Sequence, residues 1–253
     1  MKIITYNVNG LRSALKKDFL IWLKAADPDV LCLQEIKTLP EQIDFALFAE
    51  LGYTGYWHSA AKKGYSGVAI FTKQTPKNVQ IGCGIDCYDQ EGRVIRADFD
   101  NFSLMNVYMP SGSSGEHRQA FKMKWLDDFF AYIQELKKTH PALVICGDFN
   151  ICHKPIDIHN PKANKNSSGF LPEEREWMTN FFNLGFIDAF RHFNQEPCNY
   201  TWWSYRISAR ARNLGWRIDY QVVSECIASS LKRALILSEA KHSDHCPVLL
   251  EIL

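Results

Sequence analysis

Polar side chains follow apolar, strand-like segments at several points along the chain, and the clearest case lies between Leu143 and Ile151. That stretch reads LVICGDFNI: the apolar run stops at Gly147, and Asp148 and Asn150 follow with an aromatic residue between them. Side chains two positions apart on an extended chain share a face, and glycine lets the backbone turn or approach another group closely. Asp and Asn also favour turns, so this stretch taken alone favours an ordinary strand end.

The same combination recurs at other strand margins. Asparagine, glutamate, tyrosine, aspartate and histidine side chains stand where further apolar runs end or begin, and turn chemistry alone does not account for so many. Open α/β sheets bind ligands beyond the ends of their strands, so the sequence predicts a site where these margins meet. The residues concerned are Asn7, Asn9, Glu35, Tyr108, Asp219, Asp244 and His245.

These side chains suit a divalent metal ion that acts on a phosphate ester. Glu35, Asp244 and the amides of Asn7 and Asn9 offer the hard oxygen donors that magnesium prefers. No group of His and Cys residues has the spacing of a zinc site. The sequence therefore predicts Mg²⁺ as the cofactor, with Mn²⁺ able to substitute for it.

The remaining residues suit acid–base roles. His245 could present its imidazole to a phosphate oxygen while Asp219 fixes the tautomer of that ring. Asp148 could activate a water molecule that Asn150 orients, and such general-base help is worth about 10²–10⁴-fold in rate. Each residue also has a structural alternative: His245 as a satisfied structural histidine, Asp219 as a buried hydrogen-bonded acid, Tyr108 as part of the core. Their joint occurrence at strand margins favours the functional interpretation.

The segment between residues 202 and 217 combines arginine with aromatic side chains and contains no acid. Such a mixture suits phosphates together with stacked or unstacked bases. Because the formal net charge of the whole chain is only +1, nucleic-acid binding would depend on a local patch of this kind; the alternative is a solvated surface loop. The patch comprises Arg206, Arg210, Arg212 and Arg217, with Trp202, Trp203, Tyr205 and Trp216.

The elements that must position these residues include both strands and helices. Strands are expected at Lys2–Tyr6, Val30–Gln34, Gly67–Thr72, Val94–Phe99, Ser103–Tyr108, Leu143–Cys146, Ile218–Val223 and Val248–Ile252. Helical periodicity is clearest in Gln119–Thr139, where Phe121, Trp125, Phe129 and Ile133 are four apart. Weaker helices are expected at Ala14–Leu23, Glu41–Leu51 and Glu173–Leu184, the last beginning after Pro172.

Some of these strands are joined by helices and others by short turns. This mixture predicts an α/β fold, namely a four-layer αββα sandwich in which two mixed β-sheets are flanked by helices. Neither half of the chain carries a separate set of motifs, so residues 1–253 are expected to form a single catalytic domain. The polar segment His153–Ser168 lies between two motifs and is expected to be a functional loop.

Composition is that of a globular protein, with 46% hydrophobic and 23% charged residues. No stretch approaches the roughly 20 apolar residues that span a bilayer, and Met1 leads directly into a strand-like run, so neither a membrane segment nor a signal peptide is expected. The eight cysteines form no CxxC pair, and several lie in apolar runs, where cysteine behaves as a small hydrophobe. They are expected to be reduced thiols in a cytoplasmic protein.

At this point a resemblance can be named. The motifs YNVNGLR, LCLQEIK, GYSGVAI, VYMP, CGDFN, NPKANKNSSGF, TWWSYR, NLGWRIDY and HSDHCPV resemble those of the exonuclease III family of apurinic/apyrimidinic endonucleases, within the endonuclease/exonuclease/phosphatase superfamily. They occur in the family's order from Lys2 to Val248. GDFN and SDH alone would indicate only the superfamily, whereas GWRIDY and NPKANKNSSGF are typical of its DNA-repair branch.

The resemblance implies an αββα sandwich and a Mg²⁺-dependent hydrolase. Its expected reaction is cleavage of the phosphodiester 5′ to abasic sites in double-stranded DNA, together with 3′→5′ exonuclease and 3′-phosphodiesterase activity. The expected partner is double-stranded DNA with abasic sites or 3′ ends, with no membrane involved. The protein is expected to be a monomer of the bacterial type, cytoplasmic and associated with the nucleoid when it acts on DNA.

The resemblance also implies roles for individual residues. Glu35 and Asp244 resemble metal ligands, with Asn7 and Asn9 beside them. Among the catalytic residues, Asp148 resembles the group that activates water, Tyr108 and Asn150 orient the phosphate, and Asp219 pairs with His245. The full set expected around the metal is Asn7, Asn9, Glu35, Asp148, Asn150, Asp244 and His245. The substrate-binding set is Asn164 and Asn166 in a phosphate-contacting loop, Trp202, Trp216 and Ile218 in an apolar pocket for a flipped-out sugar, and Arg206 and Arg210 from the arginine patch.

Three features depart from the family pattern. Position 9 is Asn, whereas some relatives have Asp, which leaves the metal shell one carboxylate fewer. The loop PSGSSGEHR after Tyr108 is short and rich in small residues, so the role of a longer loop against DNA is open here. No basic or redox-partner extension precedes the core, and the chain is therefore expected to be the bare nuclease core, as in bacterial members.

Two other functions are compatible with parts of the pattern. A superfamily phosphatase for lipid or inositol phosphates would share the acids but has no use for the Trp/Arg patch. A DNA-damage-binding module without catalysis would not need Glu35, Asp148, Asp219 and His245 intact. The sequence leaves open the balance of endonuclease and exonuclease activity, the number of metal ions, the true general base and any protein partners.

Overall fold

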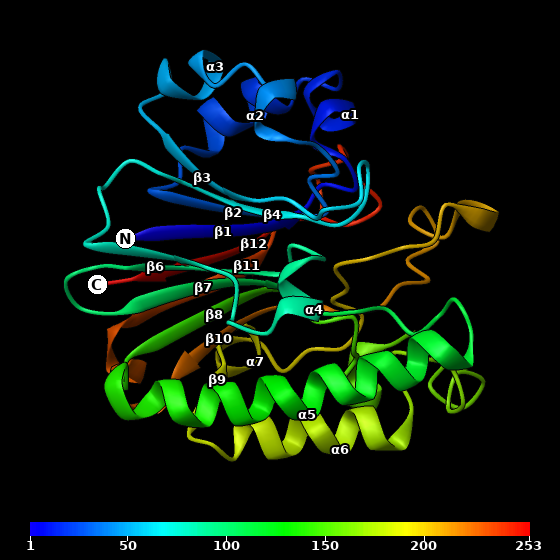
Figure 1. Ribbon diagram of the computed structural model, residues 1–253. Helices are drawn as coiled ribbons and strands as arrows, with labels where there is room; N and C mark the ends of the chain where they lie inside the picture. Colours follow the sequence, from blue (N-terminus) through cyan, green and yellow to red (C-terminus); the bar gives the residue numbers. More distant parts are fainter.

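In a computed structural model that describes residues 1–253, apart from the side chain of Ile207, two six-stranded β-sheets pack face to face. Helices cover the outer face of each sheet, so that four layers are stacked (Figure 1). Both sheets contain parallel and antiparallel neighbours. The predicted αββα sandwich is confirmed.

The first sheet is built around the N-terminal strand. Strand β1 (Lys2–Asn7) pairs in parallel with β2 (Val30–Gln34) and antiparallel with β12 (Val248–Ile252). The sheet order is β11-β12-β1-β2-β4-β3, with β11 at Leu231–Ile236, β4 at Val68–Thr72 and β3 at Thr54–His58. Its outer face carries α1 (Leu11–Leu15), α2 (Phe19–Ala26), the 3₁₀ turn η1 (Pro40–Gln42) and α3 (Ala46–Ala49).

The second sheet has the order β5-β6-β7-β8-β10-β9. Its strands are β5 (Asn78–Ile81), β6 (Val94–Asp98), β7 (Ser103–Tyr108), β8 (Leu143–Asp148), β10 (Asp219–Ser224) and β9 (Phe186–Asp188). The long helix α5 (Glu116–Thr139) and α6 (Pro172–Phe182) lie side by side over its outer face (Figure 1). Shorter elements are α4 (Asp86–Asp89), η2 (Pro155–Asp157), α7 (Ala189–Phe193), η3 (Arg206–Ser208) and η4 (Glu225–Ser230).

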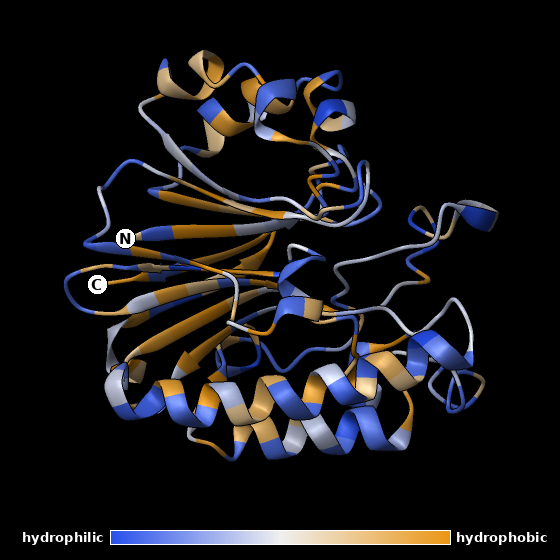
Figure 2. Ribbon diagram, viewed as in Figure 1, coloured by the Kyte–Doolittle hydropathy of each residue, from blue (hydrophilic) through white to orange (hydrophobic). Residues whose placement is uncertain are grey.

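The core explains why the central strands read as unbroken apolar runs. In β8, Val144 and Cys146 pack between the two sheets, while Leu143 and Ile145 pack against the helices. A strand buried on both faces has no solvent side, so its sequence does not alternate with polar residues. Figure 2 shows these strands as the most hydrophobic part of the chain, with the exposed sides of the helices hydrophilic.

The predicted strands are all present, with ends that match or differ by at most two residues, and the two longer predicted helices are present as α5 and α6. The helix expected at Ala14–Leu23 is wrong as a single element: α1 ends at Leu15, and Asp18, in the left-handed region at φ 60°, separates it from α2. The helix expected at Glu41–Leu51 is also wrong in length, because only η1 and the single turn of α3 form there.

Four strands of the structure had no expected counterpart. They are β3, β5, β9 and β11, which are the edge strands of the two sheets, and β9 is only three residues long. Their residues are largely half-buried or exposed, so they lack the apolar run by which a strand is recognised. Among the described helices, none combines the length and apolarity that crossing a membrane requires.

Strand register brings the polar margins to one end of the sandwich. The parallel pairing of β1 with β2 places Asn7 beside Gln34, directly before Glu35. The parallel pairing of β7 with β8 places Tyr108 beside Asp148, and the antiparallel pairing of β10 places Asp219 opposite Asp148. Both sheets therefore present their polar residues at the same end, as the sequence predicted.

Candidate active site

A cavity of about 420 Å³ lies at this end of the sandwich, lined by side chains from both sheets and from the loops beyond them. One part of its lining is polar and comes mainly from strand ends. Another part is apolar and aromatic. The lining residues are Glu35, Tyr108, Ser111, Ser113, Asp148, Asn150, Ser168, Gly169, Trp202, Trp216, Ile218, Asp244 and His245.

The polar part centres on two carboxylates from different sheets. Ligand-type atoms of Glu35, Asp148 and His245 lie within 4.8 Å of one another. The Asn7 amide bridges the two acids, because its Nδ2 donates to Glu35 Oε1 at 2.9 Å and to Asp148 Oδ2 at 2.8 Å. In this arrangement Asn7 orients both carboxylates across the junction between the sheets.

The turn Gly147–Asn150, which taken alone favoured an ordinary strand end, contributes two side chains to the cavity. Gly147 has φ 139°, and a Cβ there would lie 1.9 Å from the carbonyl oxygen of Val107, so only glycine fits beside β7. Beyond it, the backbone N–H of Asn150 donates to Asp148 Oδ1 at 2.8 Å, and Asn150 Nδ2 donates to the Met109 carbonyl at 2.9 Å. The turn thus points the carboxylate and the amide into one cavity.

The pKa of the Asp148 carboxyl group is raised above its usual range. Burial in the protein, followed by the negative charge of Asp219, raises the pKa of Asp148 to about 7. A carboxyl group with a pKa near neutrality can both accept and release a proton at physiological pH. Asp148 is therefore suited to proton transfer with a water molecule.

His245 and Asp219 form a buried pair. His245 Nδ1 lies 2.9 Å from Asp219 Oδ2, and His245 Nε2 lies 3.9 Å from Asp148 Oδ2. Burial opposes a charge on His245, but the carboxylate of Asp219 outweighs it and raises the pKa of His245 to about 10. An imidazolium donates from both ring nitrogens and has no lone pair for a metal, so in this state His245 suits a phosphate oxygen better than a cation.

The donor set fits a hard divalent cation. The Lys37 ammonium already lies between two predicted ligands, 2.8 Å from Glu35 Oε2 and 2.5 Å from Asn9 Oδ1. Asn9 Nδ2 in turn donates to Asp244 Oδ1 at 3.0 Å. Burial works against the charge of Glu35, yet Lys37 lowers its pKa. These oxygens thus favour positive charge, and together with Asp148 they match the ligands that Mg²⁺ prefers.

The apolar part of the lining comes from loops. Trp202 and Trp216 meet edge to face, with ring centroids 6.1 Å apart and an interplanar angle of 89°. Ile158 and Trp202 each form an isolated antiparallel bridge with Trp216, and Ile218 belongs to the same apolar cluster. A Cβ on Gly169 would lie 3.1 Å from the Trp216 ring, so the loop packs tightly against it. We call Trp202, Trp216 and Ile218 the apolar wall.

Comparison with known proteins agrees with this geometry. The model of the endonuclease/exonuclease/phosphatase family matches residues 4–245. The chain belongs to this family. It is 47% identical to an exodeoxyribonuclease of Bacillus subtilis, over 98% of each chain, and 43% identical to the DNA repair nuclease APEX1 of Danio rerio, over 99% of this chain and 81% of the relative.

The fold also matches a solved structure of an AP endonuclease. The structure of an AP endonuclease from Archaeoglobus fulgidus superposes with a TM-score of 0.91 at 32% identity, covering 100% of this chain and 99% of that one. Together with the exodeoxyribonuclease and repair-nuclease relatives, it identifies this member of the family as a DNA-repair nuclease. The lipid or inositol phosphatase and the non-catalytic binding module are not supported.

The predicted substrate-binding residues Asn164 and Asn166 do not line the cavity. Asn164 stabilises its own loop, since its Nδ2 donates to the carbonyls of His159 and Asn160. Asn166 is exposed two residues further on. The segment His153–Ser168 is more ordered than a plain loop, because it contains η2. Whether the two asparagines contact phosphate stays a prediction.

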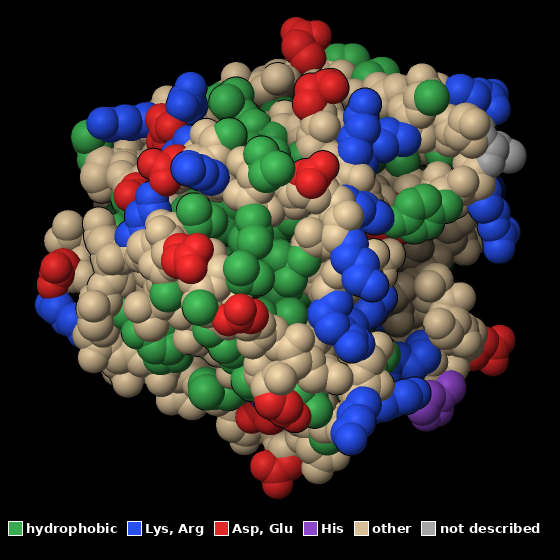
Figure 3. Space-filling model, turned by 90° about the horizontal axis from the view of Figure 1, so that it is seen from above, with side chains coloured by type: hydrophobic (Ala, Val, Ile, Leu, Met, Phe, Trp, Pro, Cys, Tyr) green, Lys and Arg blue, Asp and Glu red, His purple; other side chains and the backbone are tan. Residues whose placement is uncertain are grey.

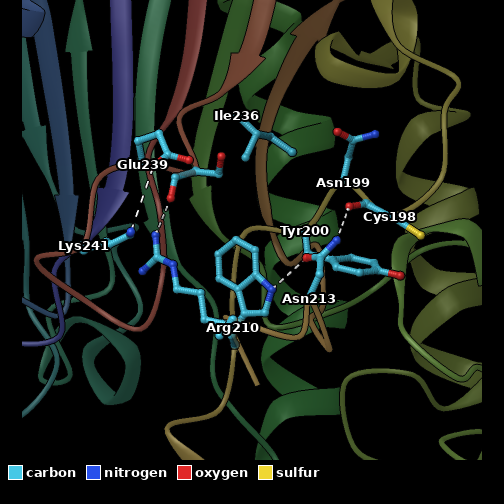
Figure 4. Close-up of a pocket in the computed structure, with 11 residues that line it drawn as sticks. Cys198, Asn199, Tyr200, Arg210, Asn213, Ile236, Glu239 and Lys241 are labelled. Carbon is cyan, nitrogen blue, oxygen red and sulfur yellow. Dashed lines mark hydrogen bonds and ion pairs between the residues drawn. The ribbon is translucent and has the colours of Figure 1, made fainter. Parts of the chain in front are cut away.

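The arginine patch does not form one surface. The expectation is wrong for Arg217, which is 1% exposed and pairs with Asp157 and Asp188 at 2.8 and 2.7 Å. Arg206 and Arg212 are exposed, whereas Arg210 turns into a separate hollow (Figure 4). Arg206 begins η3, Arg210 and Arg212 follow in turns, and Arg217 stands two residues before β10, so the four side chains leave the backbone in unrelated directions.

Positive charge nevertheless gathers near the site. In Figure 3, Lys and Arg side chains gather beside a hollow, on the side of the molecule towards which the loops around the site project. The formal charge of the whole chain is only +1. Local excess charge of this kind attracts a phosphate backbone without requiring a strongly basic protein. This distribution suits a nuclease that binds DNA.

Sequence reasoning missed a buried ion pair behind the Asp148 turn. Lys122 on α5 and Glu174 on α6 are both 0% exposed and lie 2.6 Å apart. Lys122 Nζ also donates to the Asn150 carbonyl at 2.9 Å, and Glu174 accepts from the backbone N–H of Gly169 at 2.6 Å. The pair therefore holds two parts of the cavity lining. One signal was available: Lys122 is three residues before Trp125, on the apolar face of α5.

Proposed function

We propose that this nuclease uses Mg²⁺ to hydrolyse the phosphodiester 5′ to an abasic site in double-stranded DNA. One observation carries the proposal: a single cavity joins the polar cluster at the strand ends to the apolar wall. A phosphate suits the first part and a sugar without its base suits the second. The wall of Trp202, Trp216 and Ile218 would then select a nucleotide that has lost its base.

The cost of extruding a nucleotide supports this choice of substrate. Flipping a nucleotide out of a duplex costs a few kcal/mol, and least where no base remains to be unpaired and unstacked. Trp202 and Trp216 pack edge to face in the cavity lining, with ring centroids 6.1 Å apart, and so present one continuous aromatic surface to the cavity. A normal nucleotide would be excluded by the bulk of its base rather than by a missing hydrogen bond.

The residues around the cavity divide the chemistry among them. Asp148 takes a proton from the attacking water, which its pKa near 7 permits. Asn150 orients that water, and the His245 imidazolium donates to a phosphate oxygen while Asp219 holds its ring. Tyr108, at the end of β7, faces the same space and orients the phosphate. Glu35 and Asp244, with the Asn9 side chain, would hold Mg²⁺, which when bound neutralises charge that develops on the phosphate.

A cleavage assay tests the proposal. The substrate is a duplex oligonucleotide with one tetrahydrofuran abasic analogue, compared with the same duplex carrying an intact nucleotide, each with Mg²⁺ and with EDTA. We expect Mg²⁺-dependent incision on the 5′ side of the analogue, leaving a 3′-hydroxyl, and far slower incision of the intact duplex. Equal rates on the two duplexes, or incision in EDTA, would contradict the proposal.

The exodeoxyribonuclease relative from Bacillus subtilis favours a second activity of the same site. A terminal nucleotide at a 3′ end has no stacking neighbour in its own strand on one side, so it can enter the cavity at lower cost than an internal one. We therefore include 3′→5′ exonuclease and 3′-phosphodiesterase activity in the proposal. A recessed 3′-end substrate in the same assay measures the balance between these activities.

We also propose that the protein acts as a monomer in the cytoplasm. All eight cysteines are free in the structure, and four of them are buried as small apolar side chains, which is compatible with a reducing compartment. The cavity is lined by residues of one chain. Light scattering at micromolar concentration, with and without DNA, measures the oligomeric state directly.

A further inference from the structure

Arg210 is fully engaged by one segment of the chain. Its Nη1 donates to the carbonyls of Ser243 at 3.0 Å and His245 at 3.5 Å, and its Nη2 donates to those of Ser238 at 2.8 Å and Ala240 at 2.5 Å. Each Nη atom carries two hydrogens, so these four bonds use every Nη hydrogen. A guanidinium in this state cannot also form a two-pronged contact with a phosphate.

The environment of Arg210 holds the guanidinium in place. Arg210 lines a hollow of about 530 Å³ (Figure 4), and its Cζ lies 4.7 Å from the centroid of the Trp203 ring. Trp203 is 4% exposed, and its indole N–H donates to Asn213 Oδ1 at 3.1 Å. The backbone N–H of Trp203 donates to the carbonyl of Asp244 at 3.0 Å. Arg210 and Trp203 therefore both donate hydrogen bonds to carbonyls of residues 238–245.

That segment, residues 238–245, needs such support. It follows β11 and precedes β12, with no ladder of strand hydrogen bonds of its own. It carries Asp244, whose Oδ1 accepts from Asn9 Nδ2 and whose Oδ2 accepts from Trp202 Nε1, both at 3.0 Å. Carbonyls that lack strand partners must be satisfied in another way when they are shielded from water, and Arg210 supplies the donors.

We propose that Arg210 is a positioning residue for Asp244, holding the 238–245 segment so that this carboxylate stays directed at the cavity, and is not a DNA contact. The proposal rests on the role of Asp244 as a metal ligand in the proposed function. Groups that orient a metal ligand typically contribute 10–100-fold to metal affinity. The sequence alone had suggested the opposite role, since arginine near aromatic residues is typical of nucleic-acid binding.

The two roles of Arg210 lead to opposite measurements. The test compares wild type with Arg210→Met and Arg210→Lys in the full chain. Mn²⁺ binding is measured by calorimetry without DNA, and DNA affinity is measured in EDTA at several salt concentrations. For Arg210→Met we expect Mn²⁺ binding to weaken about 10-fold or more, with metal-free DNA affinity and its salt dependence unchanged.

Arg210→Lys guards against the case in which Arg210→Met fails to fold. Lysine keeps the charge but lacks the planar fork, so it can satisfy only part of the four carbonyls. We expect Mn²⁺ affinity between those of wild type and Arg210→Met, and a thermal midpoint close to that of wild type. Arg212→Met is the matched control: Arg212 lies two residues away and is exposed, so its loss should leave Mn²⁺ affinity unchanged.

Two results would overturn the proposal, and they are distinguishable. If Arg210 contacts DNA, Arg210→Met lowers the slope of log affinity against log salt by about 1 and leaves Mn²⁺ affinity as in wild type. If wild type itself binds no Mn²⁺ while Glu35→Gln changes nothing, the metal site of the proposed function fails, and the positioning role fails with it. Weakened Mn²⁺ binding, with an unchanged dependence of DNA affinity on salt, supports the proposal that Arg210 positions Asp244.

Discussion

The two parts of the cavity are built in different ways. The polar cluster of Asn7, Glu35 and Asp148 stands at the ends of neighbouring strands, where regular sheet pairing fixes the backbone. The apolar wall stands on irregular segments joined by isolated bridges, such as that between Trp202 and Trp216. Asn7, Glu35 and Asp148 are thus held at the ends of paired strands, whereas the apolar wall is held by contacts between loops.

This difference separates chemistry from selectivity. Strand ends in a twelve-stranded core cannot shift without disturbing both sheets, so the polar cluster should tolerate few changes. The wall depends on side chains packed between loops and can alter without loss of the sheet register. We therefore expect changes in the polar cluster to abolish turnover, and changes in the wall to alter which DNA is cleaved.

Metal removal should have the largest effect. Because Glu35 and Asp148 lie within 4.8 Å in a buried setting, chelation by EDTA should abolish cleavage, and added Mg²⁺ or Mn²⁺ should restore it. Glu35→Ala should lower kcat far more than DNA affinity, which a binding assay in EDTA measures separately. Full activity in excess EDTA, with no tightly bound metal found by elemental analysis, would contradict the metal site.

The His245–Asp219 pair should show the next largest effect. Asp219→Ala and His245→Ala should each lower kcat by about 10²–10⁴-fold, because each removes the oriented imidazolium. The double variant should lose much less than the product of the single losses, since the 2.9 Å contact makes them one unit. Rates from single-turnover assays on the abasic duplex give this comparison, and multiplicative losses would mean independent action.

The wall has its own buried support, which Arg217→Met tests. Arg217 lies between Trp216 and Ile218 in sequence, and its guanidinium pairs with Asp157 and Asp188. Removing one partner of a buried ion pair typically costs about 3–5 kcal/mol of unfolding free energy. We expect a loss of about that size in denaturant unfolding, and reduced preference for abasic DNA below the melting temperature.

Arg233→Met is the matched control for this change. Arg233 pairs with Glu251 at 2.6 Å, but its side chain is 53% exposed. Exposed pairs of this kind contribute little to stability, so the control should unfold like wild type and keep its selectivity. If Arg217→Met matched the control in both measurements, the buried ion pair would not support the wall.

Trp216→Ala should have the smallest effect on turnover but change the choice of substrate. The ring packs against Gly169 and Trp202 and offers no group for proton transfer or metal binding. We expect Mg²⁺-dependent cleavage to persist while the rate ratio of abasic to intact duplex falls on the order of tenfold, as for other changes of pocket size. A folded variant with unchanged selectivity would remove Trp216 from the wall, and an unfolded one would show that the ring serves the core.

Much of the polar cluster could be predicted because its signals are local. An apolar run that stops at a polar pair, as before Asp148 and Asn150, reveals a buried strand and its end within a few residues. The side-chain alternation of an extended chain then places both groups on one face. The same logic identified Asn7 and Glu35, and the structure brings all four to the site region.

The fate of each arginine could not be predicted, because it depends on partners far away in the chain. Arg217 is buried since Asp157, 60 residues earlier, meets it inside the fold. Arg210 is turned away from solvent by carbonyls about 30 residues later. Arg206, in the same stretch, is exposed. All three lie in one acid-free segment rich in aromatic residues, so the local sequence does not distinguish them.

Sequence by itself thus determined the interior strands of both sheets, their polar ends and the chemical class of the site, because hydrophobic periodicity and strand termination are properties of neighbouring residues. Only the tertiary structure decided which charges are exposed and which are buried beside the site, as Lys122 is beside Asn150. The physical reason is that a charged side chain can be buried only where an opposite charge or a set of carbonyl groups from another element lies next to it. Whether such a partner lies there depends on how the whole chain packs.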